Sequence, residues 1–166
     1  MEHTVKKSIL AATTVAVASA AGTGSIASPG RTAGWYSRLR KPPYQPPGAV
    51  FPIVWTTLYG DIAATSAVAI DRFRAAGRDD AARRYVAALC ANLIINASWS
   101  WLFFRYHRLG ASALGAAVLA VSSADLVRRT AQADPRAGLA LSPYPVWCTF
   151  ATFLATHVWR LNRGGE

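Results

Sequence analysis

The segment Trp35–Tyr59 has the sequence W-Y-S-R-L-R-K-P-P-Y-Q-P-P-G-A-V-F-P-I-V-W-T-T-L-Y. Its first half is basic and holds four prolines within six residues, at positions 42, 43, 46 and 47. Proline fixes φ and lacks a backbone donor, so residues 42–47 are predicted to form a stiff, extended connection. Pro47 is compatible with a first helical turn, where its missing N–H costs nothing. The uncharged apolar half that follows therefore predicts a membrane helix entered directly from a rigid polar loop.

The distribution of charge along the whole chain supports a membrane protein. Of the 166 residues, 52% are apolar and 16% are charged, whereas soluble domains carry about 25% charged residues. The charges leave uncharged gaps of about 20 residues, the length of a helical membrane span. These gaps lack the alternation of a barrel strand, so they predict helices. The sequence thus predicts one all-α membrane domain, residues 1–166.

Five transmembrane helices are predicted, over residues 8–28, 47–70, 85–104, 109–127 and 137–159. The first is weakly hydrophobic and follows two lysines, which leaves a cleaved signal peptide as an alternative, although its length favours a retained helix. Five crossings place the chain termini on opposite sides of the membrane. The two sets of loops carry ten and eight Lys/Arg residues, so the positive-inside rule leaves the orientation open.

Charge and cysteine usage exclude several other classes. The net charge is +10, but the basic residues lie in short clusters between apolar runs, as in membrane loops, which argues against nucleic-acid binding. Cys90 and Cys148 lie inside apolar segments and indicate neither a disulfide nor a metal framework. No nucleophile–base arrangement is visible in the sequence. We therefore predict no metal site and find little support for catalysis in the composition.

Polar residues at membrane depth mark the candidate site. In the third predicted helix, Asn92 and Asn96 are followed at helical spacing by Trp99 and Phe103, which makes one stripe of two amides and two aromatic rings. The stripe fits the wall of a ligand pocket. It equally fits asparagines that hold neighbouring helices together. The residues alone leave both interpretations open.

Two further tryptophans lie in the second and fifth predicted helices. Trp55 shares a helix face with Tyr59 and lies about eight residues, or ~12 Å, beyond Pro47, deeper than an interfacial belt requires. We therefore expect Trp55 to point inward. Trp147 follows two prolines near the start of its helix and faces either the bundle or lipid. Asp61 does not share the Trp55 face, and its role stays open.

Three motifs resemble those of the TspO/MBR family, the translocator proteins or tryptophan-rich sensory proteins, also called peripheral-type benzodiazepine receptors. They are W-Y-x-x-L-x-K-P-x-x-x-P-P-x-x-x-F-x-x-V-W-T-x-L-Y, N-x-x-W-x-x-x-F-F and P-Y-x-x-W-x-x-F-A-T-x-L, in order between Trp35 and Asn162. The resemblance implies five transmembrane helices, a homodimer and a ligand cavity under the first loop. The implied ligand is a tetrapyrrole, protoporphyrin IX or haem, with no required cofactor.

The resemblance also carries residue roles. Trp55 and Trp147 align with two cavity tryptophans implicated in light-dependent porphyrin breakdown by some bacterial members. Asn96 and Trp99 align with family residues, and Asn92 replaces a glutamine. Near the C-terminus, Thr156 stands where the family's sterol motif needs a tyrosine, which puts sterol recognition in doubt.

The function implied by the resemblance is a tetrapyrrole-binding protein or sensor, which we expect in a bacterial cell membrane. The expected ligand-binding residues are Tyr36, Trp55, Tyr59, Asn92, Asn96, Trp99, Phe103 and Trp147. Arg38, Arg40 and Lys41 are expected to meet either a ligand carboxylate or lipid headgroups. One alternative is an enzyme that degrades porphyrin with light and oxygen, with Trp55 and Trp147 as catalytic residues. A small-molecule transporter, with Asp61 and Asp125 on a polar path, is the other.

Overall fold

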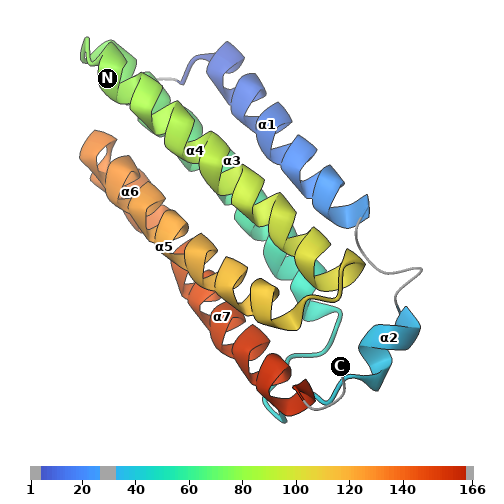
Figure 1. Ribbon diagram of the computed structural model, residues 1–166. Coiled ribbons are helices and arrows are strands. Elements are labelled where there is room, and N and C mark those ends of the chain that lie inside the picture. The colour runs from blue at the N-terminus through green and yellow to red at the C-terminus, as the bar shows by residue number, and fades with distance from the viewer. Residues whose placement is uncertain (1–4, 27–32, 164–166) are drawn as a thin grey trace.

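The fold was established from a computed structural model, which describes residues 5–26 and 33–163. Every regular element in this part of the chain is helical, which confirms the all-α prediction. The elements are α1 (Lys7–Ile26), α2 (Ala33–Arg38), α3 (Val50–Ala75), α4 (Asp79–Ser100), the π-helical turn η1 (Trp101–Arg105), α5 (Leu109–Ala133), α6 (Pro135–Ala140) and α7 (Pro143–Asn162). Figure 1 shows the long helices side by side, with α2 at one end of the bundle.

Within residues 5–26 and 33–163, four helical segments are long and apolar enough to cross a membrane. They are α1, α3, α5 and the combined segment Asp79–Arg105, formed by α4 and η1. The 20-residue helix α7 is long enough but is not among these four. Its prolines and the polar residues of its last two turns lower its apolar content. The structure therefore supports a protein that crosses the membrane several times. By length and hydropathy, its helices support four of the five predicted spans.

The fifth predicted helix, residues 137–159, is wrong as a single element. The structure divides this region into α6 and α7, with a turn at Leu141 and Ser142 between them. Proline has no backbone N–H to continue the hydrogen bonding of α6, but it is favoured in a first helical turn, so Pro143 begins a new helix instead of continuing the old one. By contrast, Asp134-Pro135 stops α5 as the sequence indicates, because α5 ends at Ala133.

Several helices extend beyond the apolar segments that predicted them. Instead of ending at residue 70, α3 continues to Ala75, and α5 runs past residue 127 to Ala133. Helix α4 begins at Asp79, six residues before its predicted start at 85. Charged side chains are compatible with a helix. Acidic residues at its start and basic residues at its end stabilise it through favourable interactions with the helix dipole. Hydropathy marks the membrane-embedded part of a helix, whereas the helix itself continues into the polar region.

The proline-rich connection differs from the extended loop predicted for it. The connection, residues 39–49, follows the short helix α2 and has no regular secondary structure. A turn is closed within it by the N–H of Gln45, which donates to the carbonyl of Pro42 at 3.1 Å. Pro43 occupies the second position of that turn, where its fixed φ is favoured. The prolines therefore bend the chain in addition to stiffening it.

The short helix α6 folds back on the end of α5 and packs closely against it. Asp134 caps α6, because its carboxylate accepts hydrogen bonds from the backbone N–H groups of Arg136 (2.9 Å) and Ala137 (3.0 Å). Gly138 lies so close to α5 that an added Cβ would be 2.6 Å from the Cβ of Ala131. Only glycine fits there without displacement of backbone. This arrangement fixes where α7 starts and how it lies along α5.

Candidate functional site

A buried hydrogen-bond network, centred on Tyr144, joins four helices in the middle of the bundle. The Tyr144 hydroxyl donates to Oδ1 of Asn92 at 2.8 Å and accepts from Nδ2 of Asn96 at 3.2 Å. The network continues to α3, where the Tyr59 hydroxyl donates to Oδ1 of Asn96 at 2.9 Å. It reaches α5, where Nδ2 of Asn92 donates to the Ser122 hydroxyl at 3.0 Å. Tyr144 and Asn92 are completely buried.

This network bears on the two interpretations that the sequence left open for the asparagines. Asn92 and Asn96 each use both their amide nitrogen and their amide oxygen in bonds to other helices. Satisfied buried amides of this kind hold helices together at a defined depth and rotation. The geometry thus shows the interhelical role directly, and a contact between these amides and a ligand stays a prediction.

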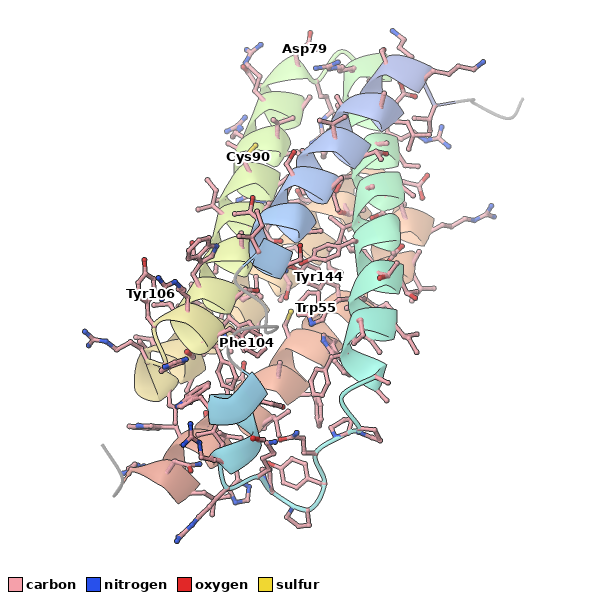
Figure 2. All side chains as sticks on the ribbon, turned by 90° about the vertical axis from the view of Figure 1, so that its right-hand side faces the viewer. Trp55, Asp79, Cys90, Phe104, Tyr106 and Tyr144 are labelled. Carbon is pink, nitrogen blue, oxygen red and sulfur yellow. The ribbon has the colours of Figure 1, made fainter. Side chains whose placement is uncertain are left out.

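An aromatic cluster adjoins the network on the side of the proline-rich connection, and Figure 2 labels Trp55 and Tyr144 within it. The ring of Trp55 lies 5.5 Å from that of Tyr59 and meets the edge of Tyr144 at 6.4 Å, centroid to centroid. Phe51, one turn earlier on α3, meets Trp147 of α7 edge to face at 5.8 Å. The fold therefore brings the two predicted tryptophans into one cluster on α3 and α7.

Trp147 has an unusual feature within this cluster. Its indole nitrogen Nε1 is buried and has no hydrogen-bond partner in the described part of the chain. A buried N–H without an acceptor costs free energy, since it loses its bond to water and gains none in return. By contrast, Nε1 of Trp99 donates to the backbone carbonyl of Ser112 at 2.9 Å. Of these two indole N–H groups, only that of Trp147 lacks an acceptor among the residues that the structure describes.

The other half of the predicted stripe lies under α2. Trp99 stacks on Phe103 with ring centroids 5.4 Å apart and nearly parallel planes. Phe103 in turn meets Trp35 at 5.9 Å and Tyr36 at 6.1 Å, both from α2. Asn92 and Asn96 thus belong to the central network, whereas the aromatic half of the stripe supports the start of the connection.

Tyr36 and its neighbours hold the connection over this end of the bundle. The side-chain amide of Gln45 donates to the Tyr36 hydroxyl at 3.0 Å, and the ammonium group of Lys41 lies 4.0 Å from the centre of the Tyr36 ring. Burial raises the pKa of Tyr36 above its ordinary value, so the ring stays neutral beside the lysine. Arg38 donates from Nε to the carbonyl of Gly34 in its own helix. A ligand or headgroup contact for the basic residues stays a prediction.

The connection is also tied to the end of α7. The side chain of Asn162 accepts from the N–H of Arg40 at 3.1 Å and donates to the Arg40 carbonyl at 2.9 Å. The hydroxyl of Tyr44 and Nδ1 of His157 are 3.0 Å apart. These bonds hold residues 40–44 against the helix that carries Trp147. The connection and the aromatic cluster therefore form one structural unit.

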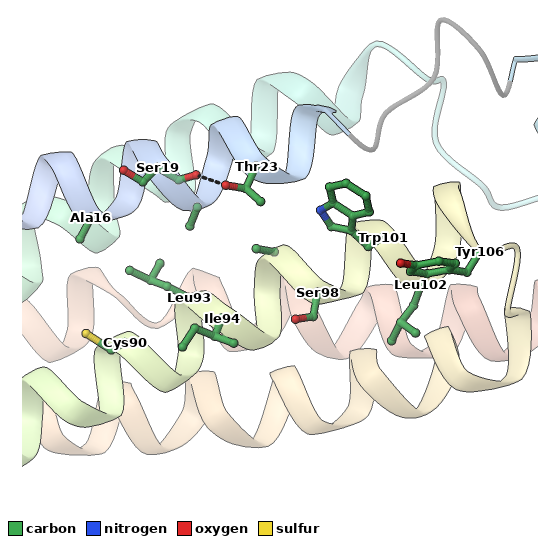
Figure 3. A pocket seen from close by; sticks show the side chains of 12 residues that line it. Ala16, Ser19, Thr23, Cys90, Leu93, Ile94, Ser98, Trp101, Leu102 and Tyr106 are labelled. Atoms are coloured by element: carbon green, nitrogen blue, oxygen red, sulfur yellow. Dashed lines mark hydrogen bonds between the residues drawn. The ribbon is translucent and has the colours of Figure 1, made fainter.

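A separate apolar groove of about 690 Å³ lies between α1 and the α4–η1 segment (Figure 3). Small residues of α1, such as Ala16 and Thr23, form one wall, and Cys90, Ile94 and Trp101 lie on the other. None of the predicted ligand-binding residues lines this groove. It is a feature of the outer surface of the bundle, distinct from the aromatic cluster.

Sequence reasoning missed the residue at the centre of the network. Tyr144 lies between Pro143 and Pro145, and this triplet indicated only a loosened helix start. Ser122 carried no signal at all, because serine is common in these helices. The one available signal for Tyr144 was its place in the C-terminal motif P-Y-x-x-W. Within residues 5–26 and 33–163, no three His, Cys, Asp or Glu side chains are grouped to hold a metal ion.

Comparison with known proteins places these features in a family. The model of the TspO/MBR family matches residues 11–160. The protein CrtK of Rhodobacter capsulatus is 35% identical, over 90% of this chain and 90% of its own length. A tryptophan-rich sensory protein of Cereibacter sphaeroides is 31% identical, over 86% of this chain and 84% of its own. The translocator protein of Homo sapiens is 29% identical, over 78% and 76% of the two chains.

Proposed function

The chain belongs to the TspO/MBR family, and from this premise we propose that it is a tetrapyrrole-binding protein or sensor. Membership confirms the resemblance found in its three motifs, and the multi-pass membrane localisation is confirmed with it. Its relatives include bacterial proteins, consistent with the predicted bacterial cell membrane. The relatives are named as sensory and translocator proteins. Tetrapyrrole binding is the more specific step that we add.

The observation that carries this proposal is the indole N–H of Trp147, which lies inside an aromatic cluster and has no acceptor among the described residues. A porphyrin is a flat apolar ring system that bears carboxylates. Its faces would pack against Trp55 and Trp147, since aromatic rings favour offset or edge contacts with one another. An oxygen acceptor on the ligand would satisfy the buried N–H and so offset the cost of leaving that donor without a partner. Lys41 and Arg40, on the connection above, supply positive charge for the carboxylates.

The proposal includes a fifth membrane crossing by α7 and a homodimer. At 1.5 Å per residue, the 20 residues of α7 span about 30 Å, the thickness of the hydrocarbon core. Its polar residues His157, Arg160 and Asn162 lie in its last two turns, where they reach the interface. The homodimer rests on the family resemblance alone.

Titration of the purified protein with protoporphyrin IX tests the proposed site. The binding is followed in the dark by the porphyrin absorbance, which does not depend on the tryptophans being replaced. We expect the Trp55→Phe/Trp147→Phe double variant to bind about tenfold more weakly, since two ring contacts of about 0.5–1.5 kcal/mol each are altered and one donor is lost. Trp101→Phe, in the α1–α4 groove, is the matched control and should bind as the unmodified protein does.

Unchanged affinity in the double variant would remove the aromatic cluster as the ligand site. Weakened binding in the Trp101→Phe control instead would move the site to the groove. Repeating the titration under illumination addresses the enzyme alternative. Porphyrin loss that needs the protein and disappears in the double variant would favour degradation over binding alone.

A further inference from the structure

A second concave site lies at the opposite end of the bundle from the proline-rich connection. It is a pocket of about 220 Å³ between the α3–α4 hairpin and the end of α5. Figure 2 marks this end by Asp79, and Tyr106 lies toward the other end. Four arginines line the pocket: Arg78, Arg84, Arg128 and Arg129. In the sequence Arg78 and Arg84 precede the other two by roughly 50 residues, and only the fold brings the α3–α4 hairpin and α5 together here.

The charge around the pocket is only partly neutralised. Asp125 forms ion pairs with Arg128 at 2.6 Å and with Arg129 at 2.5 Å, so one carboxylate serves two guanidinium groups. Arg84 donates from Nε to the backbone carbonyl of Asp80 at 3.4 Å. Arg78 lies over the ring of Phe73, with its guanidinium carbon 5.0 Å from the ring centre. In the described part of the chain, neither Arg78 nor Arg84 has a carboxylate partner.

The floor of the pocket is rigid and adds no negative charge. Tyr85 is 1% exposed, and its hydroxyl is bonded to the hydroxyls of Ser66 at 3.1 Å and Thr130 at 2.9 Å. Phe73, 3% exposed, packs beside Tyr85 with ring centroids 6.2 Å apart. The arginines thus surround a fixed neutral base, which leaves their positive charge directed at whatever enters the pocket.

The chemistry of this pocket suits an anion with several oxygen atoms. Arginine offers a planar fork of donors that matches phosphate oxygens two at a time, and every basic residue lining the pocket is arginine. The pocket also lies where membrane-spanning helices α3, α4 and α5 end, which is the depth of the lipid headgroups. Basic residues at that depth attract anionic lipids.

We propose that this pocket binds a phosphate group, supplied by the headgroup of an anionic phospholipid or by free phosphate. The site is independent of tetrapyrrole binding, because the aromatic cluster lies toward the other end of the same helices. The two arginines without a carboxylate partner, Arg78 and Arg84, make the decisive contacts. Arg128 and Arg129, shared with Asp125, complete the positive wall.

Thermal melting of the full-length protein in neutral detergent tests the site. The protein is melted with added phosphatidylglycerol, phosphatidylcholine or inorganic phosphate. The control for inorganic phosphate is sodium chloride at the same ionic strength. The test variant is Arg78→Gln/Arg84→Gln. The control is Arg74→Gln/Arg83→Gln, which removes the same charge from the same end of the molecule without touching the pocket. We expect phosphatidylglycerol to raise the melting temperature of the unmodified protein and the control more than phosphatidylcholine does.

The rise in melting temperature caused by phosphatidylglycerol should be at least halved in the test variant, and it should shrink at high salt. If inorganic phosphate gives an increment with the same dependence on Arg78 and Arg84, the source is free phosphate. A full increment in the test variant overturns the proposal, as does an equal loss in the control, which would indicate diffuse surface charge. A single cooperative melting transition without added lipid shows that each variant is folded, and Arg84→Gln alone replaces the double variant if that one does not fold.

Discussion

At the scale of single residues, the hydroxyl of Tyr144 links α7 to α4 through two buried hydrogen bonds. This hydroxyl donates to Asn92 on α4 and accepts from Asn96 one turn later. Those two amides in turn reach Tyr59 on α3 and Ser122 on α5. One oxygen atom therefore fixes how α7 meets the rest of the bundle at the depth of the aromatic cluster.

We expect Tyr144→Phe to destabilise the protein by about 1 kcal/mol, because two buried amides each lose a partner. The lower end of the usual range applies, since in a membrane the unfolded state also finds partners for such groups. Thermal melting in detergent measures the change. Tyr106→Phe is the control, because Tyr106 is 61% exposed and no hydrogen bond of its hydroxyl is seen in the described structure. Equal melting temperatures for the two variants would contradict the structural importance of the network.

At the scale of elements, prolines and one aspartate decide where the helices of the second half begin. Asp134 ends α5 and caps α6, and Pro143 separates α6 from α7. Asp134 also forms an ion pair with Arg72 at the end of α3, 3.4 Å from its Nε. The hydrogen bond from the backbone N–H of Ala137 is the main reason that the pKa of Asp134 lies below its ordinary value of 3.8.

This depressed pKa predicts a dependence of stability on pH. A carboxyl group that holds its proton less tightly in the folded protein stabilises the fold above its ordinary pKa. That stabilisation is lost as the pH falls from about 3.8 through the folded-state pKa. Asp134→Asn keeps an acceptor for the cap but has no charge, so its melting temperature should lie below that of the unmodified protein at pH 7.

The difference between Asp134→Asn and the unmodified protein should shrink on acidification below pH 3.8. Asp134→Ala, which also loses the cap, should cost about 1 kcal/mol at neutral pH. Melting curves across this pH range make the comparison. A gap between the Asn variant and the unmodified protein that is constant with pH would show that the charge of Asp134 contributes nothing.

At the scale of the whole molecule, the two ends of the bundle differ in chemistry. One end carries the proline-rich connection over an aromatic cluster, and the other carries arginines around a small pocket. The first helix begins at the arginine-rich end, and α7 ends beside the connection (Figure 1). If α7 crosses the membrane, the chain makes five crossings and its termini lie on opposite sides.

Topology reporters test this arrangement. A reporter active on only one side of the membrane is fused after Leu141, before α7, or after Asn162, at its end. We expect opposite signals from the two fusions, because α7 is long enough to span the hydrocarbon core. The fusion at Asn162 should also oppose one at the N-terminus. The same signal at both ends of α7 would mean that this helix lies on the membrane and does not cross it.

The sequence by itself determined the all-helical class, four of the membrane spans and the family. Hydropathy and motif spacing are properties of the chain taken locally, so they can be read without a fold. The sequence also identified Trp55, Asn96 and Trp147 as candidate ligand-binding residues, but it did not show which residues they contact. The predicted break at Asp134-Pro135 was equally local, because capping and proline geometry involve only neighbouring residues.

Only the tertiary structure decided which polar groups satisfy one another. It paired the amides of Asn92 and Asn96 with Tyr144 and left the N–H of Trp147 without an acceptor among the described residues. It also gathered four arginines around one pocket: Arg78, Arg84, Arg128 and Arg129. These outcomes depend on the rotation and depth of each helix relative to its neighbours. Those quantities are set by side-chain packing between distant segments, such as Gly138 against Ala131, and no local pattern encodes them.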